Sequence, residues 1–157
     1  DSLAVSSAVA HKHVRLALAL MERAMTTARL SLGRSRRLAI ECVLDASALI
    51  ACCVQLTGAR DVAIDSGAVV VAHTCLMWLI HHSGDMWHKS TASTMARLGC
   101  NCINTVACLV EPGKMASSAE KAAGLCILVE RIRLSHTMPA KAHGRIVKSS
   151  RRLLGIP

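Results

Sequence analysis

Basic side chains gather in two parts of the sequence, and they are the groups best placed to bind a ligand. One cluster holds Arg34, Arg36 and Arg37. The other follows Glu130, contains no carboxylate, and holds Arg131, Arg133, Lys141, Arg145, Lys148, Arg151 and Arg152. Such clusters can neutralise phosphate groups or meet an acidic protein surface. The sequence therefore predicts binding of nucleic acid, or of an acidic partner protein, through these residues; a face that only keeps the protein soluble is the alternative.

Histidine and cysteine could supply a metal site, because both ligate zinc when several converge at fixed distances. The densest group is His81, His82 and His88, beside an expected turn, and Cys100 and Cys102 follow them. No Cys-x-x-Cys pair occurs. A metal-binding helical bundle is thus one alternative, and surface histidines with core thiols are the other. The sequence does not indicate which metal such a site would take, and no cofactor is predicted.

Two pairs of carboxylates could hold a divalent cation if they faced each other. Glu41 and Asp45 lie four residues apart, as do Asp61 and Asp65, so each pair would share one helix face. A di-iron bundle would also need Glu-x-x-His, which no segment provides. Solvent-exposed acidic stripes are the competing interpretation.

Residues 42–50 read CVLDASALI. This segment resembles the first strand and turn of the PIN-domain ribonucleases, in which the equivalent aspartate helps to bind a catalytic divalent metal. The resemblance implies a metal-dependent nuclease in which Asp45 has that role. It covers nine of the 157 residues, and the chain departs from the family because it has no carboxylate after Glu130.

Other catalytic motifs are missing from the sequence. No Gly-x-Ser-x-Gly elbow, no P-loop and no Gly-x-Gly-x-x-Gly fingerprint occurs. We therefore expect a non-catalytic structural or interaction protein, with the nuclease as the competing hypothesis.

The apolar residues are of an unusual kind. They make up 52% of the chain, yet Phe and Tyr are absent and only two Trp occur. Aliphatic side chains, Met and Cys must then fill the core, and binding of single strands by aromatic stacking is disfavoured. Most cysteines lie in apolar segments, namely Cys42, Cys52, Cys53, Cys75, Cys108 and Cys126. They are expected to be buried thiols in a reducing compartment, which suggests the cytoplasm.

Apolar residues recur at helical intervals through most of the chain. We expect helices at 3–32, 38–56 and 61–82, then a fourth segment that ends near 110 and that Gly99 may divide. A helix should begin at the capping-box pair Ser117 and Glu120 and reach about 134, and a last one should span 140–154.

The stretch 62–80 is long and apolar enough to suggest a membrane span. The other helical segments carry several charges each, and two Trp cannot form an interfacial belt, so no membrane is expected. The predicted fold is a single all-α domain over 1–157, an antiparallel bundle of five or six helices. It should form a homo-oligomer, because so much helix surface is apolar.

Overall fold

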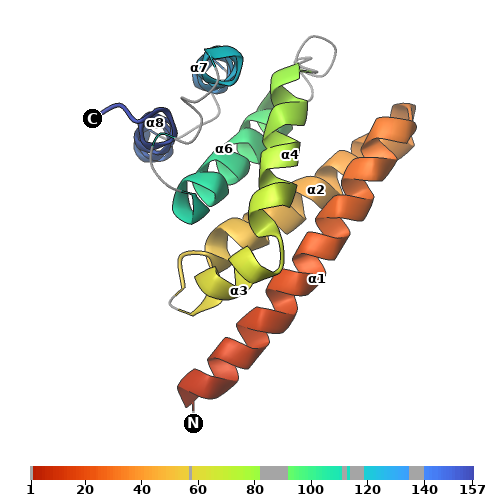
Figure 1. The fold of residues 1–157 in the computed structure, drawn as a ribbon. Helices are drawn as coiled ribbons and strands as arrows, with labels where there is room; N and C mark the ends of the chain where they lie inside the picture. The colour runs from red at the N-terminus through yellow and green to blue at the C-terminus, as the bar shows by residue number, and fades with distance from the viewer. Residues whose placement is uncertain (1, 57, 82–91, 111–112, 114–118, 135–139) are drawn as a thin grey trace.

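The computed structural model describes residues 2–56, 58–81, 92–110, 113, 119–134 and 140–157. Nearly all of these residues are helical, and they contain no strand, which confirms the prediction of an all-α fold (Figure 1). The helices are α1 (Ser2–Leu30), α2 (Gly33–Cys53), α3 (Ala59–Asp65), α4 (Ala68–His81), α6 (Ala92–Leu109), α7 (Ala119–Leu134) and α8 (Ala140–Leu154).

Helices α1 and α2 form a long antiparallel hairpin (Figure 1). Each buries one stripe of small and aliphatic side chains, such as Leu18 and Met21 on α1 and Val43 and Ile50 on α2. The two residues on α1 are three positions apart and the two on α2 are seven apart, which places each pair on one face of its helix. The connection is short because α2 begins at Gly33, with a φ of +59°.

The early start of α2 corrects one prediction. The sequence predicted helices at 3–32 and 38–56, with residues 34–37 as a polar connection between them. In the structure these four residues form the first turn of α2. Gly33 adopts the left-handed conformation, which is inexpensive only for glycine, and so reverses the chain within two residues.

The single helix expected at 61–82 is two helices. Helix α3 ends at Asp65, α4 starts at Ala68, and their axes are bent by 72°. Gly67, with a φ of +84°, lies at the break. The valine-rich start of α4 is helical, as predicted. No single helix among the described residues has the length and apolar character to span a membrane, whereas α3 and α4 taken together meet those two criteria as a bent pair.

Helix α6 occupies the centre of the fold and packs against α2, α4, α7 and α8 (Figure 1). It runs uninterrupted through Gly99, so the division considered there does not occur. A Cβ atom on Gly99 would lie 2.9 Å from Cδ1 of Ile132 on α7, which shows how closely α6 and α7 approach. The missing side chain of Gly99 leaves room for Ile132, and the glycine does not end the helix.

The core is aliphatic, as the composition predicts. Its largest fully buried side chains come from α1, α2, α4, α6, α7 and α8, and Trp78 is 5% exposed at its edge. Figure 1 shows α7 and α8 nearly end-on while α1 and α2 run across the view, so the last two helices cross the hairpin steeply. The specific antiparallel bundle is therefore not confirmed, and the described residues form seven helices, not five or six.

Candidate anion-binding surface

Helix α8 separates apolar from basic side chains. Ile146, Ser150 and Leu153 are buried against the rest of the fold. Exposed cations occupy the opposite side, which we call the basic face of α8: Arg145, Lys148, Arg151 and Arg152. At 100° per residue these four side chains span about one third of the helix circumference. The backbone of Lys141 belongs to the same helix, but its side chain lies outside the described part of the structure.

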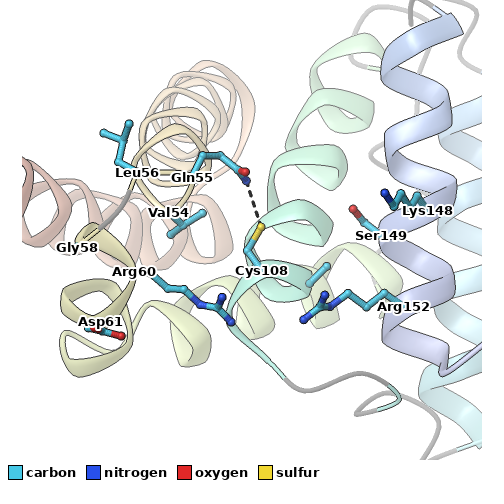
Figure 2. A pocket seen from close by; sticks show the side chains of 11 residues that line it. Val54, Gln55, Leu56, Gly58, Arg60, Asp61, Cys108, Lys148, Ser149 and Arg152 are labelled. Atoms are coloured by element: carbon cyan, nitrogen blue, oxygen red, sulfur yellow. Dashed lines mark hydrogen bonds between the residues drawn. The ribbon is translucent and has the colours of Figure 1, made fainter.

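A pocket of about 540 Å³ opens beside this face (Figure 2). Three stretches that are distant in sequence enclose it: the segment from the end of α2 to the start of α3, the end of α6, and α8. Its lining residues are Val54, Gln55, Leu56, Gly58, Arg60, Asp61, Ala107, Cys108, Lys148, Ser149 and Arg152. We call it the Arg60 pocket.

Two guanidinium groups meet in the Arg60 pocket. Figure 2 shows the side chains of Arg60 and Arg152 pointing toward one another from α3 and α8, with Lys148 one turn away on α8. Asp61 is the single carboxylate of the lining, and it lies on α3 apart from the facing guanidiniums. The lining therefore carries three positive charges and one negative charge, so its surface is net cationic.

Hydrogen bonds fix the walls of this pocket. Nε2 of Gln55 donates to Sγ of Cys108 at 3.1 Å, which ties the end of α2 to α6. The hydroxyl of Ser149 donates to Oδ1 of Asn104 at 2.9 Å, which ties α8 to α6. The amide of Gly113 donates to the carbonyl of Arg152 at 2.8 Å and holds the end of α8. The cationic side chains thus project from helices whose relative positions are fixed by hydrogen bonds.

The cations on α7 are placed differently from those on α8. Nε of Arg133 donates to Oε2 of Glu130 at 2.9 Å, and the pair forms a salt bridge. This hydrogen bond and the charge of Glu130 raise the pKa of the Arg133 guanidinium above its ordinary value. Arg131 is half-buried. Part of the positive charge predicted for this region is therefore already neutralised.

The first arginine cluster lies elsewhere. Arg34 and Arg37 are exposed and Arg36 is half-buried, all in the first turn of α2. Figure 1 places this turn at the opposite end of the hairpin from α3, and α8 lies across the molecule from it. The structure therefore does not join the two predicted basic regions into one surface.

Arg60 is the functional candidate that sequence reasoning missed. It is the only arginine or lysine between residues 38 and 86, a stretch in which acidic residues predominate. This isolation is the only feature of the sequence that distinguishes Arg60, and it does not predict which residues lie near Arg60 in the fold. Folding brings it opposite Arg152 of α8, which lies 92 positions further along the chain.

The candidate metal ligands do not converge in the described part of the chain. No group of three or more His, Cys, Asp or Glu side chains there could hold an ion. Glu41, Asp45, Asp61 and Asp65 are all exposed on α2 and α3, and His81 is exposed at the end of α4. His82, His88 and the capping-box residue Ser117 lie outside the described residues, as does the side chain of Glu120.

The strand that the resemblance to PIN-domain ribonucleases implies at residues 42–50 is absent, because this segment forms the middle of α2, in agreement with the helix predicted at 38–56. Asp45 consequently lies on the solvent side of a helix and not at the end of a strand. The resemblance to PIN-domain ribonucleases is therefore wrong with respect to fold. Val43, Leu44 and Ser47 are buried and Asp45 is exposed, as expected for opposite faces of a helix.

The cysteines also differ from expectation. All eight are free, and Cys42, Cys52 and Cys126 are exposed, although each was expected to be buried. Each lies on the solvent side of its helix, α2 or α7. Cys53 and Cys75 are buried, as expected, and Cys108 is half-buried.

Two thiols of α6, those of Cys100 and Cys102, have raised pKa values. Burial raises the pKa of the Cys100 thiol to about 12. A hydrogen bond with Cys75 on α4, together with burial, raises the pKa of Cys102 well above its ordinary value. Since the thiolate is both the nucleophile and the metal ligand, these two cysteines are poorly suited to either chemistry.

Fold and site together define an all-α protein with a cationic pocket beside an amphipathic helix. No family model matches the chain, and no curated protein or solved structure matches it either.

Proposed function

We propose that the chain is a non-catalytic interaction protein that binds a polyanion, specifically nucleic acid, through the basic face of α8. The observation that carries this proposal is the segregation of exposed cations on α8 from its buried side. Arg145, Lys148, Arg151 and Arg152 share this face, and the chain has no carboxylate after Glu130. Such a face suits a row of phosphates, whose contacts position a protein without reading bases.

Nucleic acid is favoured over an acidic protein because of what the basic face lacks. Interfaces between proteins centre on buried aromatic or aliphatic anchors. Of the large hydrophobic residues that are exposed in the described structure, none lies within α8. The exposed side chains described within α8 are all cationic, and one exposed apolar residue, Ile156, adjoins them from beyond the end of the helix. A face in which charge predominates is more typical of phosphate contacts. The raised pKa values of Cys100 and Cys102, and the absence of a three-ligand cluster in the described residues, support a non-catalytic role.

The proposal includes association with a second copy of the chain. Val9, Leu16 and Leu20 lie on one exposed stripe of α1, and Leu16 is 65% exposed. Two such stripes could pack against each other about a twofold axis, which is the commonest arrangement of homo-oligomers. Light scattering on the Leu16→Gln/Leu20→Gln double variant should then give a smaller mass than the wild-type chain gives. Equal masses would contradict this interface.

The polyanion proposal is tested by titrating duplex DNA with the full chain at several salt concentrations. If the four cations each contact one phosphate, log K should fall with log salt with a slope of about −3.6. Arg145→Gln and Arg151→Gln should each reduce that slope by about 0.9. Arg23→Gln is the matched control, because it removes the same charge from an exposed position on α1. Binding that is absent at low ionic strength, or that falls equally in the control, would overturn the proposal.

A further inference from the structure

The Arg60 pocket places like charges opposite one another, with few acids to compensate them. Among the described side chains, no carboxylate forms an ion pair with Arg60, Lys148 or Arg152, and Asp61 is the only acid of the lining. Facing cations repel, and the repulsion is stronger in a concave site than on an open surface. An anion between the two guanidiniums would convert this repulsion into two attractions.

The arrangement selects among anions by geometry. A guanidinium presents a planar fork of donors that matches the oxygens of a phosphate two at a time. Ser149 donates its hydroxyl proton to Asn104, and Gln55 donates one of its two amide protons to Cys108, so charged groups supply most of the donors that the pocket offers to a ligand. Convergent charged donors favour a group that carries two negative charges on several oxygens over a singly charged diester.

We propose that the Arg60 pocket binds a phosphate monoester, held between the guanidiniums of Arg60 and Arg152 with the ammonium of Lys148 beside it. The inference deepens the proposed function, because it assigns a terminal phosphate to a site at the edge of the same basic face. A cavity of about 540 Å³ exceeds the size of a phosphate ion and falls in the range of small-molecule sites. The rest of the ligand, whether a strand end or a mononucleotide, would then extend along the pocket toward Gln55 and Leu56.

The test compares one short oligonucleotide with and without a terminal phosphate monoester, at fixed low ionic strength, using the full chain. The phosphorylated form should bind about tenfold tighter, because each added charge-assisted contact has a substantial effect. Arg60→Gln should abolish that tenfold advantage and leave the dephosphorylated oligonucleotide bound as before. Arg145→Gln should weaken both forms alike, and Arg23→Gln neither. Circular dichroism of Arg60→Gln checks that the helices remain intact.

Inorganic phosphate serves as the second probe and separates the possible sources. If inorganic phosphate removes the tenfold difference in affinity between the two oligonucleotides, and if its own binding depends on Arg60, the phosphate group itself is sufficient for recognition. If only the phosphorylated oligonucleotide shows the advantage, the site takes a strand end. Equal binding of the two oligonucleotides together with no binding of inorganic phosphate overturns the inference, although salt-dependent DNA binding would still support the proposed function. Arg60-dependent binding of inorganic phosphate without any DNA binding would support the phosphate site and would overturn the proposed function.

Discussion

Nδ2 of Asn101 on α6 donates a hydrogen bond of 3.1 Å to the hydroxyl of Ser47 on α2. The same hydroxyl donates to the carbonyl of Leu44 at 2.8 Å, and Ser47 is 2% exposed. This contact, like the one between Gln55 and Cys108, is a polar link between α2 and α6, which together support the Arg60 pocket.

A double-mutant cycle on Ser47→Ala and Asn101→Ala should reveal coupling between the two helices. Each single variant should lower the free energy of unfolding by about 1 kcal/mol, and the double variant should lose about 1 kcal/mol less than the sum. Urea denaturation provides the measurement. Strict additivity of the two losses would show that the hydrogen bond contributes nothing to stability.

Two helical glycines should respond in opposite ways to alanine. A Cβ atom on Gly124 of α7 would overlap Cγ2 of Ile80, whereas nothing lies within 4 Å of one on Gly144 of α8. Gly144→Ala should stabilise the protein by about 0.5 to 1 kcal/mol through helix propensity alone. Gly124→Ala should destabilise it by about 1 kcal/mol, because overpacking outweighs the same propensity gain. Thermal melts in which Gly124→Ala is the more stable variant would refute the close contact between α4 and α7.

Alkylation of the native protein should divide the cysteines by exposure. Cys42, Cys52 and Cys126 should react first, because reagent reaches their sulfur atoms directly. Cys75 and Cys102 should react only after denaturant is added, since both are buried in the core. Peptide mass spectrometry locates the label. Native labelling of Cys75 at the rate of Cys126 would show that the interface between α4 and α6 opens readily.

The protein should lose stability in alkaline solution through its buried thiols. The pKa of Cys100 is raised from 9.0 to about 12, so the folded state holds this proton more tightly than the unfolded chain does. Its contribution is fully present below pH 9 and is lost as the pH rises toward 12. The free energy of unfolding should decline by up to about 1.4 kcal/mol per pH unit for each such thiol.

Two variants separate this effect from other titrations at high pH. Cys100→Ala should make the alkaline decline shallower, and Cys102, whose pKa is also raised, should sustain part of it. Cys126→Ser, which replaces an exposed thiol, serves as the control for the substitution itself. The chain contains no Tyr, so the ultraviolet absorbance of the thiolate can be followed without interference from tyrosinate. An identical decline in Cys100→Ala and the wild-type chain would contradict the assignment.

The helices could be predicted from the sequence where their boundaries depend on local chemistry. The last helix was expected at 140–154, and α8 spans Ala140–Leu154. In this helix Ile146, Ser150 and Leu153 are buried on one side and four cations are exposed on the other. The spacing of these residues within 15 positions is enough to predict the helix. The prediction failed at residues 66 and 67, where one long apolar stretch concealed a bend of 72°. Apolar character does not show where a helix ends when both pieces are apolar.

The candidate site was predictable only in part. The four cations of α8 were identified from their sequence, because clustering of charge within one helix can be seen without a fold. Arg60 was not, and Arg133 was included among the binding residues although it forms a salt bridge with Glu130. The nine-residue resemblance around Asp45 also misled, since an apolar run of that length is compatible with a strand or a helix.

The sequence by itself determined that this chain is helical, aliphatic in its core and basic at its C-terminal end, because helical periodicity and local charge are properties of neighbouring residues. Tertiary structure alone decided that Arg60 faces Arg152, that Cys42 is exposed while Cys75 is buried, and that the two arginine-rich regions lie apart. Those outcomes depend on how separate helices pack, and the packing is set by contacts between residues far apart in the chain.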